Sequence, residues 1–221
     1  DPFSSLNPRM TVKEILEEPL NIHRLYAKQK RNDFIREMIS KVGLSAEYLN
    51  RYPHEFSGGQ RQRIGIARAL ATSPELVIAD EPVSALDVSI QAQIINLLQD
   101  LKNAYNQTLL FISHDLALVR HLADRLAVMY LGKIVESGTE SQLFDSPMHP
   151  YTKLLLDSVP LPGIGRKTKG SFNRDEREIT PVEKGCSFYP RCPRKKQECM
   201  ENVPLLMDKG EEHLVSCFNP H

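Results

Sequence analysis

The chain has 221 residues, enough for one well-packed core or for one core with a small module. Basic and acidic side chains number 28 each, so the formal net charge is zero, and a general nucleic-acid binder, which carries a basic excess, is not expected. No apolar run approaches the ~20 residues that span a bilayer, so the chain is not expected to cross a membrane by itself.

Residues 11–56 are predicted to form a helical subdomain. Thr11 can cap a helix that ends at Pro19, because proline has no amide hydrogen to donate inside a helix. A second run of apolar residues at helical spacing stops at Gly43, and a short third helix is predicted at residues 45–50.

A helix start that can bind phosphate is predicted at four residues, Ser57, Gly58, Gly59 and Gln60. Ser57 stands where an N-cap belongs, and the two glycines let a ligand approach the backbone closely. The amides and the positive dipole end of a helix N-terminus attract anions. The alternative is a serine-capped helix without a ligand. Arg61 and Arg63 in this helix are interpreted as solvated charges without a catalytic role.

The segment after this helix is a short apolar run that ends in two carboxylates, Asp80 and Glu81. This pattern predicts a buried parallel strand whose C-terminal end delivers both side chains to a ligand crevice. One carboxylate can hold Mg²⁺, and the other can orient or activate a water molecule. A hydrated strand end is the alternative interpretation.

Strands and helices alternate in the following part, which predicts an α/β layer architecture. The predicted helices cover residues 88–105, 115–122, 139–145 and 151–158, and the predicted strands cover residues 108–112, 125–130 and 133–136. His114 follows the first of these strands. Asp87 can cap the helix that begins at residue 88.

A change of composition predicts a linker at residues 160–180 and a small separate module at residues 181–221. This module contains every cysteine of the chain: Cys186, Cys192, Cys199 and Cys217. Four thiols within about 32 residues favour one four-thiolate site for an iron–sulfur cluster or Zn²⁺. The spacing lacks the paired C-x2-C of zinc ribbons, which favours a [4Fe–4S] cluster. Free buried thiols are the alternative.

Together these motifs resemble the ATP-binding subunits of ABC transporters. The signature loop is matched at residues 57–60, the Walker B strand at 76–81, the D-loop at 84–87 and the switch histidine at 113–115. A Walker A loop and the Q-loop glutamine are not found. Residues 1–10 match the segment that directly follows that glutamine, so the chain is expected to be a piece of a larger subunit. The expected fold is a partial ABC-type nucleotide-binding domain over residues 1–159, with a helical subdomain and part of the RecA-like core.

The resemblance implies a role for each site residue. In this family two nucleotide domains enclose two ATP molecules, so residues 57–60 would contact the γ-phosphate bound by a partner domain. Asp80 would hold Mg²⁺ through water, and Glu81 would be the general base. His114 would contact the γ-phosphate, and Asp87 would act at the dimer interface, in addition to or instead of capping its helix.

Residues 4–8, residues 148–152 and the cysteine-bearing tail resemble the oligopeptide and dipeptide importers of this family, some of which carry an iron–sulfur cluster in this extension. The implied partners are a second ABC ATPase subunit, identical or paralogous, two transmembrane permease subunits and, indirectly, an extracytoplasmic solute-binding protein, without nucleic acid. The implied location is the cytoplasmic face of the inner membrane. Two alternatives stay open: a non-transport ABC ATPase of DNA repair or translation, and a truncated, non-catalytic remnant that binds a partner or a metal.

Overall fold

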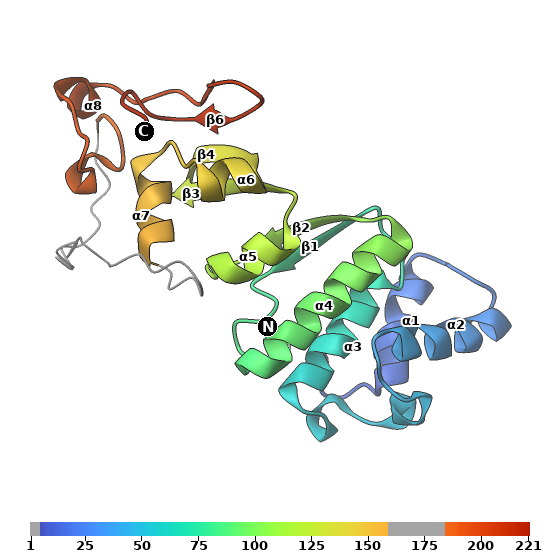
Figure 1. Cartoon of the computed structure of the whole chain (residues 1–221). Helices are drawn as coiled ribbons and strands as arrows, with labels where there is room; N and C mark the ends of the chain where they lie inside the picture. The colour runs from blue at the N-terminus through green and yellow to red at the C-terminus, as the bar shows by residue number, and fades with distance from the viewer. Residues whose placement is uncertain (1–4, 159–183) are drawn as a thin grey trace. The chain divides into compact units, whose positions relative to one another are not determined.

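The computed structural model describes residues 5–158 and 184–221 (Figure 1). It divides into two compact units, Asp1–His114 and Asp115–His221. None of the helices in the described ranges is both long enough and apolar enough to span a bilayer.

The first unit begins with the predicted helical subdomain. It contains α1 (Val12–Ile22), α2 (Lys28–Lys41) and two 3₁₀ helices, η1 (Ala46–Asn50) and η2 (Pro53–Glu55). Thr11 and Glu14 cap α1 reciprocally, as expected of its first turn. The prediction that α1 ends at Pro19 is wrong. The helix continues for one more turn because Leu20 is fully buried, and this burial offsets the hydrogen bond that proline cannot donate.

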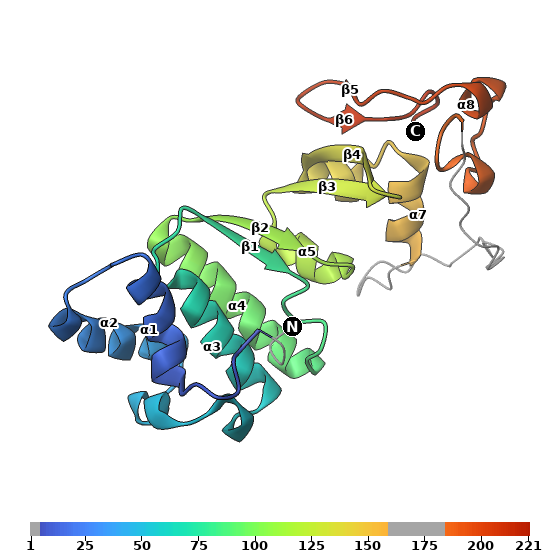
Figure 2. The ribbon, with the colours of Figure 1, turned by 180° about the vertical axis from the view of Figure 1, so that it is seen from behind.

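The remainder of the first unit contains α3 (Gly58–Leu70), β1 (Leu76–Asp80), α4 (Val88–Tyr105) and β2 (Thr108–Ile112). The two strands are parallel and in register from Leu76 opposite Thr108 to Asp80 opposite Ile112 (Figure 2). Their carboxyl ends therefore lie at one edge, where the sequence predicts the site.

β1 is less buried than the sequence predicts. Leu76 is 50 % exposed and Ile78 is 62 % exposed, whereas Ala79 is buried. Leu110 and Ile112 of β2 are also exposed. In the ranges that the structure describes, β1 and β2 form a sheet of two strands, so they lack the neighbours that normally cover a parallel strand.

The second unit is built around a hairpin of β3 (Arg125–Tyr130) and β4 (Lys133–Thr139). Leu131 and Gly132 both have positive φ, +47° and +76°, as a tight two-residue hairpin turn requires. The helices α5 (Leu116–Leu122), α6 (Glu140–Asp145) and α7 (Pro150–Ser158) complete this part.

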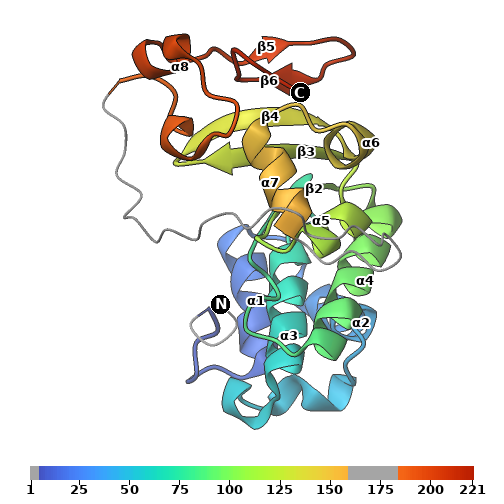
Figure 3. The same ribbon diagram turned by 60° about the vertical axis from the view of Figure 1, so that its left-hand side comes forward.

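The C-terminal residues add strands to the same sheet. They form η3 (Tyr189–Arg191), α8 (Gln197–Glu201), β5 (Met207–Asp208) and β6 (Leu214–Val215), and the strand order is β3-β4-β6-β5 (Figure 3). Phe188 is buried against the rings of Tyr130 and Tyr151. The separate module predicted for residues 181–221 is therefore not supported, because the tail shares its sheet and its core with residues 125–158. The predicted linker, residues 160–180, lies entirely outside the described residues.

Candidate functional site

The predicted phosphate-binding loop is a capped helix start. The Ser57 hydroxyl accepts a hydrogen bond from the Gln60 amide at 3.4 Å, and the Gln60 side-chain oxygen accepts one from the Ser57 amide at 3.0 Å. This reciprocal cap fixes the first turn of α3, whose N-terminus carries the positive end of the helix dipole. Both interpretations made from the sequence, the capped helix and the phosphate-binding loop, share this geometry.

The chain that leads into Ser57 is anchored from both sides. Phe56 is buried and meets the ring of Tyr48 edge-on, with 5.8 Å between centroids. The Arg61 guanidinium donates a 2.8 Å hydrogen bond back to the Pro53 carbonyl in η2. Arg61 is therefore not a solvated charge, as the sequence suggested, but a brace between the first turn of α3 and the turn before it.

Arg63 connects three helices of the first unit. Its guanidinium donates to the Val42 carbonyl, just after α2, at 2.8 Å and to the Gln93 side chain of α4 at 3.2 Å. Gly43 has φ +75°, and a Cβ built there would lie 2.9 Å from this guanidinium. The interpretation of Arg63 as a solvated charge is also wrong, because its side chain is partly buried and its guanidinium is hydrogen-bonded to two other segments of the unit.

The backbone turns sharply toward β2 just after the C-terminal end of β1. Asp80 is the last residue of the strand and is exposed. Glu81 has φ +43°, a left-handed conformation that costs energy for a non-glycine residue. Its amide donates to the Ile112 carbonyl at 2.9 Å, and its carbonyl accepts from the Ser84 hydroxyl at 3.1 Å. These bonds hold Glu81 in place at the edge where the two strands end.

The turn brings Glu81 to the predicted switch histidine. Glu81 Oε1 lies 3.1 Å from His114 Nδ1, and both side chains are at least half exposed to solvent. A carboxylate in contact with an imidazole can accept a proton from water while the imidazole ring holds the carboxylate in position. The sequence predicted both residues for one site, and the structure brings them together.

Asp87 occupies the backbone position of the N-cap of α4, but its side chain makes no capping hydrogen bond and is exposed. The turn before α4 is held instead by Gln91, whose side-chain amide donates to the carbonyls of Val83 and Leu86 at 3.1 and 3.0 Å. Sequence reasoning missed Gln91. Its position one turn into the helix after a predicted loop is the only signal that could have indicated it.

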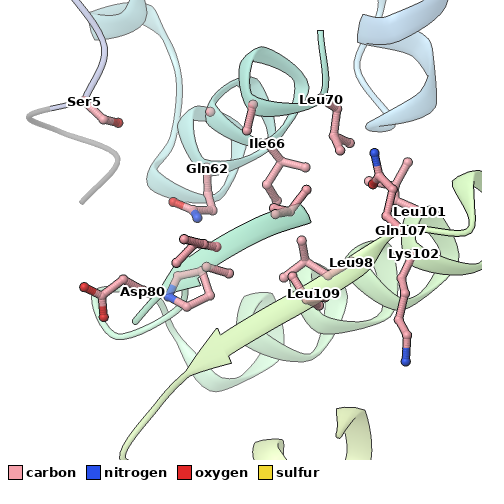
Figure 4. Close-up of a pocket in the computed structure, with 16 residues that line it drawn as sticks. Ser5, Gln62, Ile66, Leu70, Asp80, Leu98, Leu101, Lys102, Gln107 and Leu109 are labelled. Atoms are coloured by element: carbon pink, nitrogen blue, oxygen red, sulfur yellow. The ribbon is translucent and has the colours of Figure 1, made fainter. Parts of the chain in front are cut away.

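A cavity of about 200 Å³ lies between α3, β1 and α4 (Figure 4). Asp80 and Gln62 lie at one part of its wall, and the other lining side chains are mainly apolar, including Ile66, Leu70 and Leu98. An apolar lining of this kind does not suit phosphate, so the candidate site is the outer edge of the strands rather than this cavity.

The four cysteines are free thiols in the tail. Burial raises the pKa of Cys186, Cys192 and Cys217, and the neighbouring thiols add to each of these shifts. The described residues, which include all four cysteines, contain no group of three or more histidine, cysteine, aspartate or glutamate side chains placed to hold a metal ion. As placed, the thiols do not fit the predicted [4Fe–4S] or zinc site, and the structure gives that prediction no support.

A buried polar cluster that the sequence did not indicate joins the tail to β4. The Glu136 carboxylate is fully buried and accepts hydrogen bonds from the amides of Met148 and His149, at 2.7 and 3.0 Å. His213 Nε2 lies 2.7 Å from the same carboxylate. His149 is itself buried, and its Nδ1 accepts from the Tyr151 amide at 3.0 Å. This cluster connects β4, the start of α7 and the residue that precedes β6.

Acid is expected to destabilise the protein through His149. Burial lowers the pKa of this histidine from 6.5 to about 4, and nearby Glu136 opposes the shift only in part. The unfolded chain then binds more protons than the folded protein between these two pKa values. Stability from this group is fully present above about pH 6.5 and falls as the pH approaches 4, by roughly 3 kcal/mol in total.

Thermal unfolding from pH 7 to pH 4.5 measures this loss. An Asn side chain retains an acceptor near Nδ1, so His149→Asn should flatten the pH dependence, and an unchanged slope would contradict the assignment.

The fold of the site is that of a known class of proteins. The solved structure of the ATP-binding cassette MJ0796, in a dimeric post-hydrolysis state bound to ADP and phosphate, aligns with a TM-score of 0.55. The alignment covers 62 % of this chain and 59 % of that one, at 30 % identity. Residues 2–84 match the family described as ABC transporter, and residues 135–199 match the family described as oligopeptide/dipeptide transporter, C-terminal region.

Curated relatives extend the similarity over nearly the whole chain. The oligopeptide transport ATP-binding protein AppF of Bacillus subtilis is 53 % identical over 98 % of this chain. The dipeptide transport protein DppF of Haemophilus influenzae is 48 % identical and OppF of Escherichia coli is 49 % identical, each over 99 % of the chain. The chain belongs to the ABC transporter ATP-binding proteins, in the group of oligopeptide and dipeptide transport proteins. It spans about two thirds of these relatives, 66 to 67 % of their length.

Proposed function

We propose that this chain is part of the ATP-binding and ATP-hydrolysing subunit of an importer of oligopeptides or dipeptides. The observation that supports this best is the identity of 48 to 53 % to transport ATP-binding proteins, which includes the tail as well as the core. The relatives favour this function over an ABC ATPase of DNA repair or translation.

The helix start at residues 57–60 would bind the γ-phosphate of ATP held by a second nucleotide domain. Its support is the reciprocal Ser57–Gln60 cap, which gives the first turn of α3 a fixed shape. A pre-formed helix N-terminus stabilises the charge that develops on a transferred phosphoryl group, and it needs no rearrangement during the reaction. Asp87, exposed at the start of α4, would contact the partner domain.

The carboxylates after β1 would perform the hydrolysis chemistry. Asp80 supplies exposed oxygen atoms of the kind that Mg²⁺ prefers, and it would hold this ion through water. When bound, Mg²⁺ neutralises charge on the β- and γ-phosphates. Glu81 would accept the proton of the attacking water. His114, at 3.1 Å from Glu81, would orient this carboxylate and contact the γ-phosphate.

ATP binding would close two such domains, and hydrolysis would reopen them. In importers of this family this cycle drives two transmembrane permease subunits that receive solute from an extracytoplasmic binding protein. The second ATPase subunit would be a copy or a paralogue, and the location would be peripheral, at the cytoplasmic face of the inner membrane. The Walker A loop that completes each ATP site is not in these 221 residues.

The proposal is tested with the full-length protein that contains this chain, assembled with its permease subunits in vesicles. We expect ATP-dependent uptake of a labelled oligopeptide that stops when Mg²⁺ is chelated. The chain of 221 residues alone is the matched control and should show no steady ATP turnover, because it has no Walker A lysine. Absence of peptide uptake, together with ATP turnover that is stimulated by nucleic acid, would contradict the proposal.

A further inference from the structure

The second glycine of the signature loop lies against the beginning of another helix. A Cβ built on Gly59 would lie 2.6 Å from Cγ2 of Ile90, in the first turn of α4. Real Cβ atoms essentially never come so close to another atom. By contrast, a Cβ built on Gly65, in the same helix, meets nothing within 4 Å.

The Ile90 methyl group cannot easily give way. Isoleucine is branched at Cβ, and in a helix such side chains keep one strongly preferred χ1 rotamer. Ile90 is partly buried, so a different rotamer would also have to find new space. The glycine at position 59 is therefore required by a contact inside this chain.

The contact joins the starts of two functional helices. Ser57 and Asp87 are the N-cap residues of α3 and α4, two and three residues before Gly59 and Ile90. One turn further along the same pair of helices, Arg63 donates to the side chain of Gln93 at 3.2 Å. Together these two contacts fix the distance between the signature loop and the D-loop.

We propose that Ile90 is a positioning residue for ATP hydrolysis: its contact with Gly59 sets the separation of the signature loop from the D-loop. This inference rests on the proposed function, in which both loops meet the same partner domain. A side chain at position 59 would wedge the two helix starts apart. Because a misplacement of about 1 Å can cost about 10²-fold in rate, the wedge would lower turnover without touching ATP.

The test pairs Gly59→Ala with two substitutions of Ile90. Ile90→Ala removes the opposing methyl group, whereas Ile90→Val keeps a branched Cβ and the methyl group in question. Gly65→Ala is the control for an added methyl group on the same helix. Each variant is measured by thermal unfolding of this chain, and by turnover and KM for ATP of the full-length subunit in the assembled transporter.

Gly59→Ala is expected to lower the melting temperature by roughly 4–8 °C and the turnover roughly tenfold or more, with KM for ATP changed less than about twofold. Adding Ile90→Ala should restore both quantities to about the level of Ile90→Ala alone. Adding Ile90→Val should restore neither, and Gly65→Ala should melt at or above the temperature of the unmodified chain.

Two results would overturn the inference. The first is a Gly59→Ala chain that melts like the unmodified one. The second is a double variant with Ile90→Ala that regains its melting temperature but not its turnover, because the glycine would then be needed only against the nucleotide. If the unmodified transporter does not hydrolyse ATP, the proposed function fails and the positioning role fails with it, while the melting series still decides whether the contact exists.

Discussion

Replacing Glu81 with glutamine is expected to leave ATP binding intact and to lower hydrolysis by the assembled transporter about 10²–10⁴-fold, the usual contribution of a general base. The amide keeps the shape of the side chain and its contact with His114, but it cannot accept the proton of the attacking water. Turnover and nucleotide affinity, measured on the same preparation, separate the two effects. A loss of affinity equal to the loss of turnover would assign Glu81 a binding role instead.

Glu75 provides a matched control for this substitution. It is an exposed glutamate just before β1, at the opposite end from Glu81, and its carbonyl continues the pairing with Thr108. Glu75→Gln makes the same chemical change in the same strand region and should leave turnover within about twofold of the unmodified protein. Equal losses in both variants would show that the effect of Glu81→Gln is not specific to the site.

Glu136→Ala should destabilise the second unit by about 3–5 kcal/mol, because it leaves several buried hydrogen-bonding groups without their acceptor. The substitution leaves His213 and the amides of Met148 and His149 without their acceptor. Because this carboxylate is one of the contacts that attach the tail, limited proteolysis should cut residues 184–221 sooner in the variant. Thermal unfolding and the time course of cleavage measure the two consequences.

The control is Glu212→Ala, which removes an exposed ion pair with Arg125 instead. Both residues of this pair are at least half exposed, so the loss should stay within about 1 kcal/mol. If Glu136→Ala and Glu212→Ala melt at the same temperature, the buried carboxylate does not hold the tail.

Local sequence patterns predicted much of the fold. Helix α4 begins and ends where the sequence predicts, because Asp87 precedes a long apolar periodicity and Asn106 stops it in a left-handed conformation. The parallel pairing of β1 and β2 follows from two short apolar runs joined by a helix. The adjacency of Glu81 and His114 follows from that pairing, since Glu81 is the first residue after β1 and His114 is the second residue after β2.

Contacts between distant parts of the chain were beyond sequence reasoning. Glu136 and His213 are 77 positions apart, and no sequence pattern near either residue predicts their contact. The same holds for Arg63, whose partner Val42 lies 21 positions away. The spacing of the four cysteines suggested a metal centre, but spacing along a chain does not determine where side chains point. The prediction that α1 ends at Pro19 was wrong for a related reason, since the burial of Leu20 depends on tertiary contacts that the local sequence does not show.

The exposed strand pair of the first unit affects how this chain behaves in solution. In the described ranges β1 and β2 have only each other as neighbours, so each strand has one edge whose amides and carbonyls no other strand pairs, and Ile78 and Leu110 add apolar surface beside it. Such an edge is a template for strand addition by a second molecule. The 221-residue chain on its own should therefore associate as its concentration rises, and work with it calls for dilute protein or for added residues that cover this sheet.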